Sequence, residues 1–262
     1  MSHDHPELLT DARTAGPEPS STEPMRGDSI ESLEVQLGDH RAHYLRAGSG
    51  SPVVLLHGGA SDAFDWAETM VALSESHSLY APHLIGYGLS EDKSDGYYLS
   101  DFVESTLAFM DGLGLPSQVL VGHSLGGRIC LEIALRHPEM VHKLVLVNTV
   151  GFSRLSSWGM VLGTAAWVVR KILRRRQPFP RFLREDGEDK DWLCLEELSR
   201  LRVPTLIVWN RYDPYYPMGG ALKAKQIIPN ARLEVLPGFG HAPHVQNRGR
   251  FNNLLLSFID HD

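Results

Sequence analysis

A serine flanked by two glycines is the strongest chemical signal in the sequence. Residues 122–126 read Gly-His-Ser-Leu-Gly and directly follow the apolar run Val119–Val121. A serine on so sharp a turn from strand to helix takes strained backbone angles, and side chains at Gly122 and Gly126 would collide with neighbouring backbone. The N-terminal N–H groups of the following helix point at whatever the serine attacks. The pattern therefore predicts that Ser124 is a nucleophile.

A base and an orienting acid for this serine can be found in the last third of the chain. A serine hydroxyl is a weak nucleophile, so it needs both. Asp213 follows the apolar run 205–209, and His241 lies in a glycine-rich loop after the run 232–236. An aspartate before proline is ordinarily a turn former, and most of the 13 histidines must be unremarkable. Their order after Ser124, each beyond its own strand, nevertheless predicts a catalytic triad.

Two backbone amides are expected to complete this site. Acyl transfer places negative charge on the former carbonyl oxygen, which N–H groups stabilise. One donor is predicted to be Leu125, the residue after the nucleophile. The other is expected from the small-residue loop 57–60, with Gly59 favoured and Ala60 as the alternative.

Substrate contacts and cofactors are less strongly indicated. Trp66 and Tyr87 fall near loops that should border the pocket, so we expect them to line the substrate site, with plain packing as the alternative. His244 lies three residues after His241, but acidic ligands and a zinc-binding helix motif are absent nearby, so no metal is predicted. Glycine-rich phosphate-binding motifs are also absent, so no nucleotide cofactor is predicted.

Alternating strand and helix patterns supply the elements that must position these residues. This alternation predicts an α/β fold with a mostly parallel twisted sheet and helices on both faces. Strands are expected at 33–37, 42–46, 53–56, 79–82, 119–121, 143–148, 205–209 and 232–236, and helices at 65–74, 100–113, 128–137, 221–228 and 248–259.

The alternation fails between residues 148 and 202, where a short helical cap is expected. Residues 157–173 are helix-like and almost wholly apolar, and cations follow up to residue 176. One interpretation is a lid helix packed over the active site. The other is an interfacial helix, with residues 158–176 making weak contact with a membrane surface.

Composition sets the remaining expectations. The 262 residues and 42% hydrophobic content suit one α/β domain with a modest insertion. The predicted organisation is a disordered tail (1–30), a first core part (31–150), the cap (151–200) and a second core part (201–262). The net charge of −7 is mostly that of the acidic tail, so no nucleic-acid partner is predicted. Two cysteines and no signal-like segment predict free thiols and a cytoplasmic protein.

Together these motifs resemble an α/β-hydrolase-fold serine hydrolase of the carboxylesterase or lipase type, with a short cap. The resemblance rests on the loop at 57–59, the Gly-x-Gly-x-Ser turn at 86–90, the serine motif, Asp213 and His241. It implies the α/β-hydrolase fold and hydrolysis through an acyl-enzyme. Epoxide hydrolases and haloalkane dehalogenases of this fold carry aspartate at the nucleophile position, so Ser124 argues against both.

The expected substrate is a small-molecule hydrophobic carboxylic ester, medium-chain and lipid-like esters included, because the cap is short and apolar. One alternative on the same triad is a C–C bond hydrolase that cleaves vinylogous diketones of the meta-cleavage type. Two further alternatives are an acyltransferase or perhydrolase, and a non-enzymatic ligand-binding protein that retains the fold. The fold by itself does not choose among them.

Overall fold

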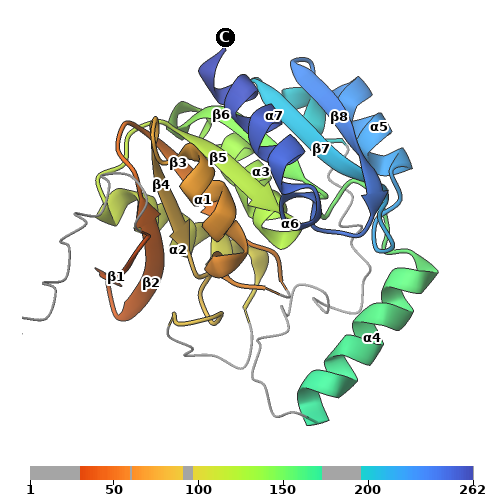
Figure 1. Ribbon diagram of the computed structural model, residues 1–262, viewed down its shortest axis with the longest axis horizontal. Helices are drawn as coiled ribbons and strands as arrows, with labels where there is room; N and C mark the ends of the chain where they lie inside the picture. The colour runs from red at the N-terminus through yellow and green to blue at the C-terminus, as the bar shows by residue number, and fades with distance from the viewer. Residues whose placement is uncertain (1–29, 60, 91–96, 173–195, 262) are drawn as a thin grey trace, which may run out of the picture.

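A computed structural model of the chain describes residues 30–59, 61–90, 97–172 and 196–261 (Figure 1). One eight-stranded sheet runs in the order β1-β2-β4-β3-β5-β6-β7-β8. The pairings of β1 with β2 and of β2 with β4 are antiparallel, and all others are parallel. The strands are β1 Glu31–Leu37, β2 His40–Ala47, β3 Ser51–Leu56, β4 His77–Pro82, β5 Gln118–His123, β6 Val141–Val147, β7 Thr205–Tyr212 and β8 Ala231–Phe239.

Helices cover both faces of this sheet, as Figure 1 shows. Alternate residues of a strand point to opposite faces, so Val53 and Leu55 enter the core beneath α1 and α7, whereas Val54 and Leu56 enter the core beneath α2, α3 and α5. The helices are η1 Ala63–Trp66, α1 Ala67–Leu73, α2 Leu99–Gly112, α3 Leu125–Arg136, η2 Pro138–Met140, α4 Ser157–Ile172, η5 Leu198–Arg200, α5 Gly219–Ile227, α6 Pro243–Gln246 and α7 Arg248–Asp260.

The predicted fold class is confirmed, and each expected strand and helix has a counterpart within a few residues. The short helix α6, directly after His241, was not predicted. Its four residues are too few for a hydrophobic period, and only Pro243 at its first position signals a helix start.

The helix α4 exists as predicted, but it does not pack over the site as a lid. Figure 1 shows it projecting from the body of the molecule. Trp158 is 72% exposed and Ile172 is 74% exposed. Among the residues between them whose exposure the structure describes, only Gly159 is buried. The sequence therefore predicted an apolar helix correctly. Its apolar side chains do not pack into the described hydrophobic core.

Several predictions fall on residues outside the described ranges: the tail except for Ile30, Ala60 as an oxyanion donor, and the cations at 174–176. The predicted division of the chain into four parts also stays a prediction. In the described ranges no helix is long and apolar enough to cross a membrane.

Candidate active site

The serine lies on a strained turn between β5 and α3. Ser124 has a φ of 51° and a ψ of −112°, outside the regions that L-residues ordinarily adopt. A β-carbon at Gly122 would overlap the backbone of Gly126 and Gly127, and one at Gly126 would overlap the carbonyl oxygens of Leu56 and His57. The two glycines are therefore required by close backbone approach, as the sequence predicted.

The three predicted triad side chains are brought together by a continuous chain of hydrogen bonds. His241 Nε2 lies 2.9 Å from Ser124 Oγ, and His241 Nδ1 lies 2.8 Å from Asp213 Oδ2. The Asp213 side chain is wholly buried, while that of His241 is 18% exposed. With Nδ1–H donating to the carboxylate, Nε2 is free to accept the serine proton.

Asp213 is held by two further donors, one of which the sequence analysis missed. Asn148 Nδ2 donates to Asp213 Oδ2 at 2.5 Å, and the Tyr215 amide donates to Oδ1 at 2.7 Å. Asn148 Oδ1 accepts from the Asn210 amide at 3.1 Å. Asn148 is fully buried with a φ of 42°, and asparagine tolerates this left-handed conformation better than most residues. The available signal was an asparagine directly after the apolar run of β6.

The loop that carries His241 is fastened to the nucleophile strand. His123 Nε2–H donates to the His241 carbonyl oxygen at 2.8 Å, and the two rings lie 4.9 Å apart. Burial lowers the pKa of His123 well below its ordinary value, and the neighbouring His244 lowers it further. A neutral His123 with its proton on Nε2 fits this hydrogen bond.

The small-residue loop after β3 lies against the serine turn. A β-carbon at Gly59 would lie 3.6 Å from the Leu125 side chain, and one at Gly58 would lie 3.3 Å from Ser124 Cβ. His57 fixes this loop, because its Nδ1–H donates to Gly58 O at 2.8 Å and its Nε2 accepts from Leu84 N at 3.0 Å. Burial lowers the pKa of His57 to about 4, so it is neutral near pH 7.

The two aromatic residues expected to line the substrate site are both buried. Trp66 is 0% exposed, and its ring stacks on His244 at 4.1 Å within the core under α1 and α7. For Trp66 these contacts favour the packing alternative. Tyr87 is 1% exposed, but its hydroxyl lies 3.6 Å from the position of a β-carbon on Gly59. A substrate contact by Tyr87 stays a prediction.

No group of three metal-ligating side chains occurs within the described ranges. His244, the candidate weighed from sequence, is 1% exposed and has neither ring nitrogen hydrogen-bonded. Burial lowers its pKa to about 3. Its contacts are rings, those of Trp66, His123 and Phe251, which is the environment of a packed core residue.

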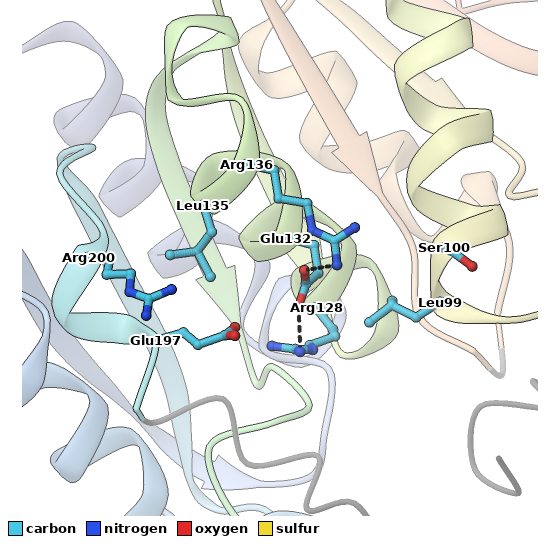
Figure 2. Close-up of a pocket in the computed structure, with 8 residues that line it drawn as sticks. All are labelled: Leu99, Ser100, Arg128, Glu132, Leu135, Arg136, Glu197 and Arg200. Carbon is cyan, nitrogen blue, oxygen red and sulfur yellow. Dashed lines mark ion pairs between the residues drawn. The ribbon is translucent and has the colours of Figure 1, made fainter. Parts of the chain in front are cut away.

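A cleft of about 570 Å³ lies beside α3 (Figure 2). Glu132 at its centre, with a side chain only 5% exposed, receives Arg128 Nη2 at 2.5 Å and Arg136 Nη2 at 2.8 Å. Arg128 is one helical turn from Ser124, and its Nε and Nη1 have no hydrogen-bond partner in the structure. The lining residues are Leu99, Ser100, Arg128, Glu132, Leu135, Arg136, Glu197 and Arg200.

Comparisons with known proteins agree with this architecture. A family model described as alpha/beta hydrolase fold matches residues 51–178. The 2-hydroxymuconate semialdehyde hydrolase of Pseudomonas putida is 27% identical, over 86% of this chain and 93% of that protein. A meta-cleavage product hydrolase from Pseudomonas fluorescens superposes with a TM-score of 0.72 at 25% identity, covering 87% of this chain and 97% of that one. A Bacillus subtilis carboxylesterase shares the fold, with a TM-score of 0.74 at 22% identity over 88% and 92% of the two chains.

The observed fold, the matched family model and the relatives together show that the protein has the α/β-hydrolase fold, and they support a hydrolase. These similarities do not extend to the bond that the protein cleaves.

Proposed function

We propose that the protein is a serine hydrolase that cleaves carboxylic esters of hydrophobic acyl groups through an acyl-enzyme on Ser124. The observation that carries this proposal is the unbroken hydrogen-bonded relay from Ser124 through His241 to Asp213. A packed structural serine has no need of a buried carboxylate placed two hydrogen bonds away. The relay is the arrangement that turns a hydroxyl into a nucleophile near neutral pH.

In the proposed reaction, Ser124 Oγ attacks the ester carbonyl while His241 Nε2 takes the hydroxyl proton. The amides of Leu125 and Gly59 stabilise the resulting oxyanion. His241 then returns the proton to the leaving alcohol as the C–O bond breaks, which leaves the acyl-enzyme. Water attacks by the same route and releases the acid. Asp213 holds the imidazole tautomer and stabilises the imidazolium that forms twice in each cycle.

Hydrolysis of a p-nitrophenyl ester series, from acetate to palmitate, tests the proposal beside Ser124→Ala. We expect turnover by the wild type and a fall of about 10³-fold or more in the variant, because the nucleophile is lost. A fluorophosphonate should label the wild type on Ser124 and leave the variant unlabelled. If the wild type is neither active nor labelled, the relay is not competent, and a ligand-binding protein of this fold becomes the better explanation.

A second candidate is cleavage of a C–C bond in a vinylogous diketone that carries a carboxylate. The similarity to two hydrolases of meta-cleavage compounds favours it. So does Arg128, a carboxylate-binding residue type that lines a cleft one helical turn from Ser124 and whose buried Nε and Nη1 have no hydrogen-bond partner in the structure.

The two candidates differ in their dependence on that cation. Under the C–C candidate, Arg128→Met should raise KM for a carboxylated diketone at least tenfold and leave KM for a neutral p-nitrophenyl ester within twofold. Arg128→Lys, which keeps the charge, should recover part of the loss. Equal effects on both substrates would mean that Arg128 has only a structural role. If the fluorophosphonate labels Ser124 but no ester is hydrolysed, diketones become the favoured substrates. Transfer of the acyl group to an added alcohol or to peroxide would instead indicate an acyltransferase or perhydrolase.

A further inference from the structure

Seven apolar side chains form one continuous stripe along the exposed helix α4. Successive residues of an α-helix are turned by about 100°, so positions spaced by three, four and seven residues share a face. Their positions fall within an arc of about 120°. The helix bears no acidic residue over its whole length. The members of this apolar stripe are Trp158, Val161, Leu162, Ala165, Val168, Val169 and Ile172.

The side chains of the stripe face solvent. Trp158 and Ile172, at its two ends, are 72% and 74% exposed, and Val161 and Val169 between them are 58% and 52% exposed. A contiguous exposed apolar surface of this kind marks a site of interaction with another protein or with a membrane. Figure 1 shows the helix standing clear of the helices that cover the sheet.

We propose that α4 lies flat on an anionic lipid surface, with the apolar stripe in the boundary between headgroups and acyl chains. The two charged residues in the sequence of the helix, Arg170 and Lys171, are both cationic. Sixteen residues span about 24 Å, less than the roughly 30 Å of a bilayer core, so the helix lies on the surface and does not span it.

Charge favours lipid over a second copy of this chain as the occupant. A second copy of α4 packed stripe to stripe would supply no carboxylate to neutralise the cations of the first helix. Anionic headgroups neutralise the same cations and strengthen binding by severalfold for each one.

The base of the helix connects this contact to the active site. The Ser156 amide donates to Tyr215 O at 2.8 Å, and Ser156 Oγ donates to Pro214 O and accepts from the Gly159 amide. The Tyr215 amide in turn binds Asp213 Oδ1, and its ring lies 5.0 Å from that of His241. A lipid-bound α4 would therefore hold the triad close to the membrane surface, where lipophilic substrates are dissolved.

The inference that the triad meets lipophilic substrates at the membrane surface rests on the proposed ester hydrolysis, whereas the membrane contact itself does not. Ser124→Ala should bind vesicles as the wild type does, so loss of catalysis and loss of binding can be told apart.

Co-sedimentation of the full chain with vesicles tests the proposal. The anionic vesicles are phosphatidylcholine with ~30 mol% phosphatidylglycerol, which gives them a negative surface charge like that of a cytoplasmic leaflet. We expect partition into these vesicles to exceed partition into pure phosphatidylcholine vesicles by about tenfold. Trp158→Gln/Ile172→Gln should lower partition into the anionic vesicles by more than tenfold, because two large apolar side chains leave the interface. Arg170→Gln/Lys171→Gln should remove the preference for anionic lipid.

The matched control is Val71→Gln/Leu222→Gln, which removes two side chains exposed to 44% and 45% on α1 and α5. It should change partition by less than twofold, and circular dichroism should show that all variants are folded. The proposal fails if the wild type does not bind the anionic vesicles, or if the control loses as much binding as the stripe variant. It also fails if sedimentation equilibrium shows a dimer that dissociates only in the stripe variant, since the stripe would then be an interface between copies.

Discussion

The buried ring of His244 should make the protein sensitive to acid, and replacing it with phenylalanine should remove part of that sensitivity. Burial lowers its pKa from 6.5 to about 3, and neither ring nitrogen has a hydrogen-bond partner in the structure. The unfolded chain therefore binds a proton below about pH 6.5 that the folded chain does not bind until about pH 3. Stability contributed by this group is complete above pH 6.5 and is lost as the pH falls towards 3.

The magnitude follows from the width of this window. At pH 5 the unfolded ring lies about 1.5 pH units below its pKa, and each unit corresponds to 1.36 kcal/mol, so His244 alone should destabilise the fold by about 2 kcal/mol relative to pH 7.5. Phenylalanine keeps the stack on Trp66 and cannot be protonated. Urea unfolding of the wild type and His244→Phe at the two pH values measures the difference.

Phe251→Leu is the control, because Phe251 contacts the same ring but does not titrate. It should lower the free energy of unfolding by the same amount at both pH values. If His244→Phe loses as much stability between pH 7.5 and pH 5 as the wild type does, the ring is not held neutral by burial, and the reasoning is refuted.

Three further predictions concern the active site. Asn148→Ala removes a hydrogen bond to the Asp213 carboxylate and leaves the Asn210 amide without its acceptor. Steady-state kinetics should show kcat lowered about tenfold with KM nearly unchanged, and urea unfolding a loss of about 2 kcal/mol; an unchanged kcat would mean that Tyr215 holds the acid unaided. Gly58→Ala should impair folding or activity far more than Gly59→Ala. The new β-carbon would lie 2.8 Å from His123 Nδ1 at position 58, but would have only ordinary contacts at position 59. Thermal melting and ester hydrolysis compare the two variants, and equal losses would contradict the close approach. His123→Phe, which removes the donor to His241 O, should lower kcat while fluorophosphonate labelling slows in proportion; normal labelling would show that the loop stays in place without this bond.

The sequence sufficed for the strands and most helices, and it named the three side chains that the structure joins by hydrogen bonds, because each is recorded locally. The serine motif requires its glycines within two residues of the nucleophile, and the acid and base each follow an apolar strand. Asn148 was missed because its role depends on what lies across the sheet. An asparagine after a strand is ordinarily a turn residue, and only the neighbouring strand reveals that its amide meets Asp213.

The sequence did not reveal that Trp66 is buried in the core or that α4 is exposed, and the physical reasons differ. Trp66 follows a loop near the site, but its ring turns into the core against His244, a residue 178 positions away. The apolar stripe has the period of a packed helix, and sequence periodicity does not distinguish burial against protein from contact with lipid.

The hydrogen-bonded relay must cross the sheet, and this explains why the site needs more than three residues. Ser124 follows β5, Asn148 follows β6, Asp213 follows β7 and His241 follows β8, in four neighbouring strands. Strands lie about 4.8 Å apart, so His241 must reach back over three intervals, roughly 14 Å, to meet the serine.

An apolar residue directly after β6, the strand between the nucleophile and the acid, would leave Asp213 short of a donor. Asn148 fills that place and binds backbone on one side and carboxylate on the other. The segment after β8 that carries His241 back towards the serine is held by His123. His123 precedes Ser124 in the chain and donates a hydrogen bond to the His241 carbonyl oxygen. Removing either support should therefore weaken catalysis while every member of the triad is still present.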